Sequence, residues 1–345
     1  MVWTTLPASF YRDPARYALE RVRIFAPSFH LAAHVSMLPQ PGDLYALNIA
    51  GYPLVIVRQH DGTLRAFHNV CRHRAGPLAG EGASSCGDHL VCRYHGWKYT
   101  LDGKLRTATG FGPAENFDVR QFGLHPASLA LWRGFIFVAP DPDASGFENF
   151  IAPLARHAAR LDLEAFHFVE QRTHDIACNW KTYAENYLEG YHVAAVHPGL
   201  AAEVDAARYR VTMEGAIAIH EAPPLSTAAN IYDGLWAWAF PVLGVNVYAD
   251  GLMMERMWPL GHDRTRLDYL FFFRDGLSQA RKDEILAMSE RVTAEDKAIC
   301  EAVQVNLNAG IYDRGVLSPT HENGVRWFQA EISRRVGEVP AAGLA

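Results

Sequence analysis

Two short stretches, Cys71-Arg-His73 and Cys92-Arg-Tyr-His95, decide the fold of this chain. They read C-x-H and C-x2-H, so each supplies one thiolate and one imidazole. In an extended loop, residues two apart project to the same side, and Cys71 and His73 can therefore reach neighbouring metals. A [2Fe–2S] cluster of the Rieske type takes two thiolates on one iron and two imidazoles on the other. The two motifs together predict such a cluster.

The same four residues also suit a structural zinc site with two cysteines and two histidines. Zinc sites usually space the two ligands of each half by about two to four residues. The single residue between Cys71 and His73 is tight for that geometry, so the pattern favours the iron–sulfur cluster. Cys86 lies between the two motifs, but no histidine is in register with it. We therefore predict that Cys86 is not a ligand.

The composition is that of a globular protein without a nucleic-acid or membrane partner. A length of 345 residues predicts about two domains. The net charge of −6, without any Lys/Arg-rich run, argues against nucleic-acid binding. No stretch reaches the roughly 18 apolar residues of a membrane span, and the N-terminus has no apolar signal core. We expect a cytoplasmic protein in which Cys86, Cys178 and Cys300 are free thiols.

The pattern of the chain changes near a predicted linker at residues 141–146. Residues 17–37 favour a helix, and residues 42–138 contain short apolar runs separated by Gly and Asp-Gly, as β-hairpins require. Beyond the linker, helices are expected over 150–161 and 278–307. The strands expected there are 210–220, 244–249, 252–259 and 266–274. This second part is therefore an α+β domain, an antiparallel sheet with helices covering one face.

A second dense stretch of functional side chains lies on a helix predicted over residues 180–196. Glu185, Glu189 and His192 are spaced by four and three and share one helical face. His197 falls off that face, so the helix must distort or end before it if both imidazoles bind one metal. Two histidines and a carboxylate on one face of an octahedron form the site of non-haem Fe(II) oxygenases. The alternative is a polar helix end that binds no metal.

The last predicted helix offers a carboxylate for that site. Its apolar stripe consists of Ile285, Met288, Val292, Ile299, Val303 and Leu307. Asp296 interrupts this stripe, and a buried carboxylate costs several kcal/mol unless it is paired or binds a metal. Asp296 is therefore the predicted third ligand, with an arginine pair as the alternative. Off the stripe, and expected to be solvated, lie Asp283, Glu290, Glu295 and Glu301.

With these motifs in this order, the chain resembles the α subunits of Rieske non-haem iron oxygenases, including choline monooxygenase-like and carnitine-oxygenase-like members. The resemblance rests on C-R-H-R at 71–74, C-x-Y-H-G-W at 92–97, N-W-K at 179–181, E-N-Y-L-E-G-Y-H at 185–192 and E-D at 295–296. It implies an all-β Rieske [2Fe–2S] domain at 41–145, inserted in a helix-grip (START-like) antiparallel-sheet catalytic domain at 146–345. Residues 1–40 would then pack as a helical segment against the catalytic domain.

The resemblance also implies roles for individual residues. His192, His197 and Asp296 would hold the mononuclear Fe(II), while Glu189 and Asn186 would complete the catalytic set. Glu189 matches the acidic residue that links an iron histidine to a cluster histidine of a neighbouring subunit, which requires a homotrimer. Many ring-hydroxylating members have aspartate there, and glutamate is more similar to the choline- and carnitine-oxidising members.

We therefore expect the terminal oxygenase of a multicomponent system. Its cofactors would be the [2Fe–2S] cluster and Fe(II), with O2 as co-substrate. The chain has no Gly-rich dinucleotide fingerprint, so NAD(P)H would act only indirectly, through a partner reductase or ferredoxin. A Rieske-type electron carrier and a zinc-stabilised helix-grip ligand-binding protein are the alternative classes.

The substrate class stays open at this point. A small organic substrate would undergo monooxygenation, dioxygenation or demethylation. Aromatic and apolar side chains in residues 235–241 and 252–258 could line its pocket. Aromatic walls suit a flat ring, but their faces also attract a quaternary ammonium group.

Overall fold

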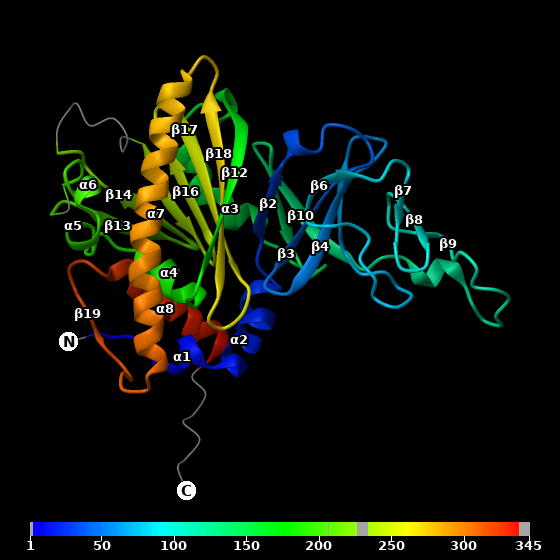
Figure 1. The fold of residues 1–345 in the computed structure, drawn as a ribbon, viewed down its shortest axis with the longest axis horizontal. Coiled ribbons are helices and arrows are strands. Elements are labelled where there is room, and N and C mark those ends of the chain that lie inside the picture. Colours follow the sequence, from blue (N-terminus) through cyan, green and yellow to red (C-terminus); the bar gives the residue numbers. More distant parts are fainter. Residues whose placement is uncertain (1–2, 206, 226–233, 338–345) are drawn as a thin grey trace, which may run out of the picture. The chain divides into compact units, whose positions relative to one another are not determined.

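The computed structural model describes residues 3–205, 207–225 and 234–337, which fall into two compact units. The inserted unit is Phe25–Phe147, and the main unit is Met1–Ile24 with Glu148–Ala345 (Figure 1). The sequence places the first boundary near residue 40. In the structure the inserted unit begins earlier, because β2 (His30–His34) pairs antiparallel with β11 (Phe135–Ala139). The helix predicted over 17–37 accordingly ends at Phe25, where a π-helical turn stops.

The inserted unit consists of antiparallel strands in two sheets. The larger sheet has the order β2-β11-β10-β5-β4-β3-β6, and the smaller has the order β7-β8-β9. Its strands are β3 (Asp43–Ile49), β4 (Tyr52–Arg58), β5 (Leu64–His68), β6 (Gly82–Ser85), β7 (His89–Val91), β8 (Lys98–Thr100), β9 (Leu105–Thr107) and β10 (Pro126–Trp132). Gly62 and Gly103 have positive φ in the turns before β5 and β9, as the Asp-Gly pattern predicts.

The core of the inserted unit lies beneath the two ligand motifs. Leu44, Val55 and Val57 from the larger sheet pack in one cluster with Leu90 and Tyr99 from the smaller sheet. Both motif cysteines belong to the same buried cluster. The motifs are therefore anchored on a packed core rather than on free loops.

The main unit is built on a seven-stranded antiparallel sheet of order β12-β18-β17-β16-β15-β14-β13. Its strands are β12 (Phe166–Ile176), β13 (Arg210–Glu214), β14 (Ile217–Glu221), β15 (Leu235–Ala239), β16 (Leu243–Val247), β17 (Gly251–Pro259) and β18 (Thr265–Arg274). The short strands β1 (Trp3–Thr4) and β19 (Val316–Leu317) pair with each other. The helices are α1 (Ser9–Arg12), α2 (Pro14–Glu20), α3 (Phe147–Ala158), α4 (Trp180–Tyr187), α5 (Val193–Val196), α6 (Pro198–Ala201), α7 (Gln279–Asn308) and α8 (Asn323–Val336). This arrangement confirms the predicted α+β class.

The sequence does not predict several of these elements, β12 and α8 among them, and the strand expected over 210–220 is a hairpin of β13 and β14. Strand β12 is the edge strand of the sheet, and only its two end residues, Phe166 and Ile176, are buried. Exposed and half-buried positions alternate between them, and these are mostly polar, which hides the usual apolar signal. Helix α8 carries Val325, Phe328, Ile332 and Val336 at helical spacing and buries all four, so its signal was present in the sequence.

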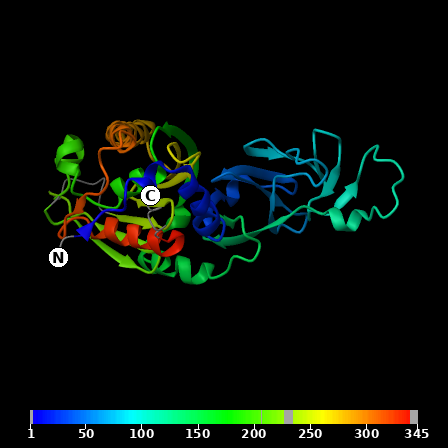
Figure 2. The same ribbon diagram turned by 90° about the horizontal axis from the view of Figure 1, so that it is seen from below.

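Helix α7 lies along one face of the sheet, as both ribbon views show (Figures 1 and 2). The Ser278 side chain caps its N-terminus by accepting from the Arg281 N–H. The predicted apolar stripe is only partly the buried one, since Ile299 is 40% exposed and Val303 is 38% exposed. The buried side of the helix instead runs through Thr293, Asp296, Cys300, Gln304 and Leu307.

The N-terminal helices are tied to the main unit by a buried ion pair. Lys181 Nζ lies 2.5 Å from Glu20 Oε1, and neither side chain is exposed. The other oxygen of Glu20 accepts from the Trp180 indole N–H at 2.8 Å. Burial lowers the pKa of the Lys181 amine, and the neighbouring Glu20 carboxylate opposes that shift. The N-W-K motif therefore serves structure, because it holds α2 against α4.

Glu20→Gln should destabilise the main unit by about 3 kcal/mol, since removing one partner leaves a buried charge unpaired. A change of that size corresponds to a fall of about 10 °C in melting temperature for a unit of this size. Differential scanning calorimetry measures it. Glu284→Gln, which removes a surface pair with Arg281 in which the glutamate is 61% exposed, is the control and should change stability by less than about 1 kcal/mol. Equal effects of the two variants would contradict the structural role of Glu20.

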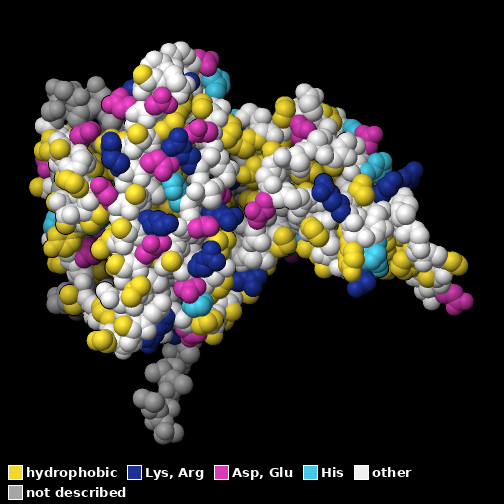
Figure 3. Space-filling view, viewed as in Figure 1, with side chains coloured by type: hydrophobic (Ala, Val, Ile, Leu, Met, Phe, Trp, Pro, Cys, Tyr) yellow, Lys and Arg dark blue, Asp and Glu magenta, His cyan; other side chains and the backbone are white. Residues whose placement is uncertain are grey.

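The surface of the main unit carries mixed charge. Figure 3 shows acidic and basic side chains interspersed over the face that carries α7. Some of them form ion pairs, such as Arg172 with Glu290 at 3.0 Å. Within the described ranges, none of the helices is both long enough and apolar enough to cross a membrane.

Candidate active site

The two ligand motifs of the inserted unit form matching turns. In each turn, the residue four positions after the cysteine donates its N–H to the cysteine carbonyl, Ala75 to Cys71 at 3.0 Å and Gly96 to Cys92 at 2.9 Å. Both donors have a positive φ, 56° at Ala75 and 72° at Gly96. The turns pack closely, because a Cβ placed on Gly76 would lie 2.9 Å from Cys92 Sγ. A glycine is required there for steric reasons.

The four predicted cluster ligands converge in this structure. Cys71 and Cys92 are buried, whereas His73 and His95 are partly exposed. The two Nδ1 atoms of the histidines lie 3.1 Å apart. The Trp97 ring stacks on His73, with centroids 4.9 Å apart and an angle of 10° between the planes. Two inward sulfurs and two outward imidazole nitrogens are the donor set that a Rieske cluster takes.

Cys86 lies apart from this group, as predicted. Its Sγ lies 3.3 Å from the carbonyl oxygen of Gly42, where it can donate a hydrogen bond.

The second candidate site begins where the predicted 180–196 helix breaks. Helix α4 ends at Tyr187, a turn follows, and α5 begins only at Val193. Gly190 allows this turn, because a Cβ there would lie 2.7 Å from the ring of Tyr209. The distortion expected before His197 is therefore present, although it begins earlier than predicted.

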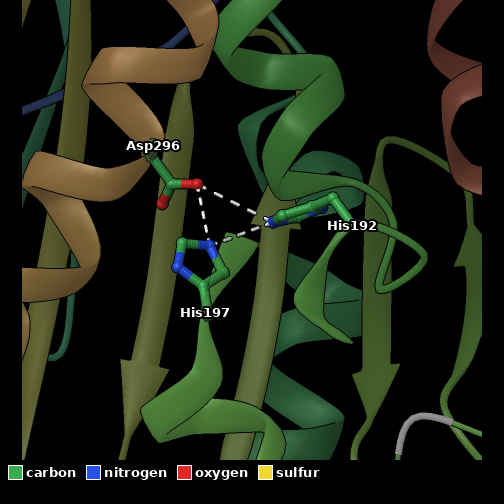
Figure 4. Close-up of side chains that lie close together, drawn as sticks. All are labelled: His192, His197 and Asp296. Atoms are coloured by element: carbon green, nitrogen blue, oxygen red, sulfur yellow. Dashed lines mark hydrogen bonds and ion pairs between the residues drawn. The ribbon is translucent and has the colours of Figure 1, made fainter. Parts of the chain in front are cut away.

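His192, His197 and Asp296 meet at one point (Figure 4). The two Nε2 atoms of the histidines lie 3.2 Å apart. Oδ1 of Asp296 lies 2.9 Å from His197 Nε2 and 3.7 Å from His192 Nε2. Asp296 is only 7% exposed, and its partners here are histidines and an asparagine rather than an arginine. Two imidazoles and one carboxylate facing a common point are the ligands of a non-haem Fe(II) site.

A second side chain hydrogen-bonds to each of the three candidate metal ligands. Glu189 Oε1 lies 2.6 Å from His192 Nδ1, and Asn186 Nδ2 donates to Asp296 Oδ1 at 2.6 Å. Glu295 Oε2 lies 2.7 Å from His197 Nδ1. Because a carboxylate occupies each Nδ1, the proton belongs there, and each Nε2 keeps its lone pair for a metal.

Glu295 is a functional residue that the sequence analysis assigned to solvent, and the structure corrects this. It is one residue from Asp296 on α7, so the two carboxylates point in different directions. His197 follows the break after α5 and reaches back between them, which no helical periodicity could reveal. Glu290 and Glu301 also have partners, Arg172 and the Ala177 N–H.

Glu185 does not join the site, although it shares the motif with Glu189. Its Oε1 accepts from the Tyr11 hydroxyl at 2.6 Å and from Gln329 Nε2 at 3.1 Å. Burial raises the pKa of Glu185 to about 7. The end of α4 at Tyr187 separates the two glutamates, since no continuous helix aligns their faces.

The second carboxylate oxygen of Glu189, Oε2, does not contact His192 Nδ1. Within this chain it accepts from the backbone N–H of Tyr191 and, at 3.1 Å, from that of His192. These bonds fix the carboxylate relative to the turn. Glu189 is therefore rigidly placed beside His192.

The triad opens into a pocket between α7 and the sheet. The aromatic lining includes Tyr187, Tyr209, Trp236, Tyr248, Tyr269 and Phe271. Trp236 and Met253, from the two stretches predicted to line a pocket, do so, whereas Trp238 is fully buried in the sheet.

The pocket also contains a third acid, Glu255 of β17, which is 3% exposed. Burial raises the pKa of Glu255 to about 8, and the negative charge of Asp296 adds to the shift. Hydrogen bonds from Tyr269 and Tyr183 oppose it. No sequence pattern singles out Glu255, because it stands beside Arg256 in the strand and reads as one half of a local charge pair.

Comparison with known families agrees with both halves of the structure. Residues 28–122 match the Rieske [2Fe-2S] domain, and residues 163–338 match the ring hydroxylating alpha subunit (catalytic domain).

Individual relatives cover most of the chain. The chloroplastic choline monooxygenase of Arabidopsis thaliana is 30% identical over 335 residues, which cover 90% of this chain and 78% of the relative. The carnitine monooxygenase oxygenase subunit of Escherichia coli K12 is 30% identical over 321 residues, covering 89% and 85%.

Solved structures show the same architecture. The quaternary ammonium Rieske monooxygenase CntA in complex with L-carnitine superposes with a TM-score of 0.85 at 28% identity, covering 97% of this chain and 96% of that one. Naphthalene 1,2-dioxygenase from Rhodococcus sp. has the same fold, with a TM-score of 0.79 at 19% identity and coverage of 97% and 95%.

The fold and the two family matches define a Rieske-type oxygenase. The chain belongs to the ring-hydroxylating α subunits of the Rieske non-haem iron oxygenases. It is the terminal oxygenase component, with a [2Fe–2S] cluster and a mononuclear iron, and it uses O2 and electrons from a reductase or ferredoxin to oxidise a small molecule. The alternatives of a pure electron carrier and of a zinc-stabilised binding protein are not supported.

Proposed function

We propose that this chain oxidises a methylammonium compound at an iron held by His192, His197 and Asp296. The observation that carries the proposal is the convergence of three ligand atoms at one end of an aromatic, acidic pocket. Three protein ligands on one side of the iron leave the remaining positions open. The bound iron supplies the O2 chemistry, while the pocket places the substrate beside it.

The hydrogen bonds behind the triad support this assignment. Glu189 and Glu295 each hold one imidazole in the tautomer that offers Nε2, and Asn186 holds Asp296. Partners of this kind orient metal ligands and make the imidazoles more basic. Their presence on all three side chains distinguishes the group from a chance cluster at a helix end.

We assign the cluster to Cys71, His73, Cys92 and His95. The paired turns, the buried sulfurs and the facing Nδ1 atoms support that set. Cys71→Ser should abolish the visible absorption of the cluster while the mononuclear iron still loads. Equal loss of absorption in Cys86→Ser would show that the ligand set is wrong.

The substrate class follows from the relatives and from the pocket. The two relatives described above are named for choline and carnitine, and both are 30% identical to this chain. The pocket combines aromatic rings with Glu255, and both attract a positively charged ammonium group. Hydroxylation of a C–H bond consumes O2, two electrons and two protons, and it yields the hydroxylated carbon and one water.

We further propose a homotrimer in the cytoplasm, with electrons passing between neighbouring subunits through Glu189. One solved relative is described as revealing inter-subunit electron transfer. Cys178 and Cys300 are both buried free thiols, which suits a reducing compartment. Sedimentation of the holoenzyme tests the trimer, and a fully active monomer would exclude the inter-subunit route.

Oxygen consumption with product analysis tests the proposed function. The holoenzyme with a surrogate reductase is given choline, L-carnitine, γ-butyrobetaine, naphthalene and benzoate in turn. Coupled O2 uptake with a methylammonium compound supports the proposal. Coupled uptake with an aromatic compound alone would overturn it.

Tyr99 should tune the cluster. Its hydroxyl oxygen lies 3.2 Å from Cys71 Sγ and accepts the Arg72 N–H at 3.0 Å, so its own proton can point at the sulfur. Hydrogen bonds to cluster sulfurs help set the reduction potential. Tyr99→Phe should lower the potential by about 50 mV, since that corresponds to about 1 kcal/mol for one electron. An EPR-monitored redox titration measures the shift, and Tyr45→Phe, a buried tyrosine of β3, is the control. An unchanged potential in Tyr99→Phe would exclude the hydrogen bond.

A further inference from the structure

Glu255 is a buried carboxylate with an unused acceptor. It is 3% exposed, and its Oε1 has no hydrogen-bond partner within the described residues. Burying such an atom without a partner is costly, so a ligand that satisfies it gains correspondingly. Glu255 lines the same pocket as the triad, which places that atom where a substrate binds.

The sheet register surrounds Glu255 with aromatic rings. On β17 it pairs with Tyr269 of β18 on one side and with Gly244 of β16 on the other. Gly244 leaves room for the Tyr187 ring, because a Cβ there would lie 3.1 Å from that ring and 3.3 Å from the Glu255 Cβ. The hydroxyl oxygens of Tyr183 and Tyr269 lie 3.1 Å apart beside it. The rings present apolar, electron-rich faces around one negative group.

The charges of the pocket are one-sided. Its described lining residues include Glu189, Glu255 and Asp296 but neither lysine nor arginine. Residues 226–233, which lie outside the described ranges, contain neither of them in their sequence. Burial lowers the pKa of His220 to about 3, so this lining histidine stays neutral. An acid group on a ligand would therefore find no lysine or arginine among the described lining residues, and only the iron as a cation.

The two other acids are already engaged. Glu189 bonds to His192, and Asp296 is bound to its two histidines and to Asn186. Glu255 is the acid of the pocket that is left for a substrate. With a pKa raised to about 8 it is largely neutral in the empty pocket, and a bound cation favours its ionised form. A neutral donor lies on the adjacent strand, since Asn246 Oδ1 accepts from the Tyr187 hydroxyl while its Nδ2 has no hydrogen-bond partner within the described part of the chain.

We propose that Glu255 is the counter-ion for the ammonium group of the substrate, and that the substrate is a cation without an acid group. This inference rests on the proposed function and narrows it. The substrate carries a quaternary ammonium at one end, against Glu255 and the tyrosine rings. Its other end carries a neutral polar group such as a hydroxyl, which Asn246 can bind. A zwitterion with a carboxylate would have to bury that charge beside Glu255 without a counter-ion.

Calorimetric titration of the anaerobic holoenzyme tests the charge recognition. The matched ligands are choline and 3,3-dimethylbutan-1-ol, which replaces the nitrogen by carbon and removes the charge. The wild type should bind choline at least about 30-fold more tightly than the alcohol. Glu255→Gln should lose most of that preference. Glu185→Gln is the control, because it changes a half-buried, hydrogen-bonded glutamate outside the pocket, and it should keep the preference.

The wild type alone tests the second half of the proposal. Choline should bind at least about tenfold more tightly than L-carnitine or γ-butyrobetaine, because these add a carboxylate. Tighter binding of L-carnitine overturns the inference, as does binding of L-carnitine that depends on Lys282, whose amine lies 6.0 Å from the Phe273 ring. The visible spectrum and iron content of Glu255→Gln show whether that variant folds. If it does not, these wild-type comparisons still test whether the substrate is a cation without an acid group.

The outcomes separate this inference from the proposed function. Turnover of L-carnitine without turnover of choline leaves the proposed function standing and overturns the role of Glu255. Turnover of aromatic compounds alone overturns both. Equal affinity of the wild type for choline and its carbon analogue shows that Glu255 is a structural acid, held neutral by its burial and by the nearby charge of Asp296.

Discussion

Asp296→Ala should lose the mononuclear iron and all coupled O2 uptake while retaining the Rieske spectrum. The carboxylate lies 2.9 Å from His197 Nε2, and no other acid of the described chain lies within 4.8 Å of both imidazole nitrogens at this point. Two imidazoles without it form a neutral site with one ligand fewer, which binds Fe(II) far more weakly. Iron analysis per chain, together with the visible spectrum, measures both halves of the expectation.

The control for this variant is its neighbour, Glu295→Ala. Glu295 supports His197 from behind without reaching the triad, so its loss should lower iron affinity or activity by about 10–100-fold rather than remove the site. Full iron occupancy in Asp296→Ala would assign the third ligand to another carboxylate. Loss of the Rieske spectrum in the same variant would show that the change disrupts the whole fold.

Glu189→Gln should keep the cluster and the iron but slow electron transfer between them by about 10–100-fold or more. Glutamine has one carboxamide oxygen, which can accept from His192 Nδ1 and preserve the tautomer that binds iron. Its NH2 group then faces the backbone N–H groups of Tyr191 and His192, where the carboxylate oxygen accepts in the wild type. The negative charge beside His192 is lost as well. Rapid mixing of the reduced enzyme with substrate and O2, following reoxidation of the cluster, measures the rate.

Glu295→Gln is the matched comparison for this experiment. Its carboxylate bonds His197 Nδ1 at 2.7 Å, as that of Glu189 bonds His192 Nδ1 at 2.6 Å. If Glu189 only orients its histidine, the two variants should slow reoxidation alike. If it also lies on the electron route between subunits, only Glu189→Gln should slow it sharply. Reoxidation at the wild-type rate in Glu189→Gln would exclude the bridging role.

The two cluster-ligand motifs could be predicted from the sequence because their geometry depends on near neighbours in the chain. Cys71 and His73 are two residues apart in a tight turn, so their side chains must point to one region whatever the rest of the fold does. The same holds for Cys92 and His95. The buried position of Asp296 was also correct, although the stripe that indicated it was not, since Ile299 is 40% exposed. Along a helix as long as α7, the face that is buried changes from turn to turn, because each turn packs against a different part of the sheet.

Elements whose burial is set by distant partners were harder to predict. Strand β12 is polar along its accessible positions and was missed, because its place at the sheet edge comes from pairing with β18. The 180–196 helix was predicted with a distortion or an end only just before His197. It breaks after Tyr187, where the turn around Gly190 packs against Tyr209 and the chain passes to α5. Tertiary packing outweighs helix propensity there.

The ligand types, their order along the chain and the class of chemistry are local properties of the sequence, because metal binding needs particular side chains at short spacings. Which acids serve the site depends instead on long-range packing. Glu185 shares the motif but bonds to Tyr11, whereas Glu295 lies outside it and holds His197. Glu255 reaches the pocket only because β17 pairs with β16 and β18 under α7. These contacts are between residues far apart in the sequence. The packing of the sheet and helices brings them together, and no local pattern encodes them.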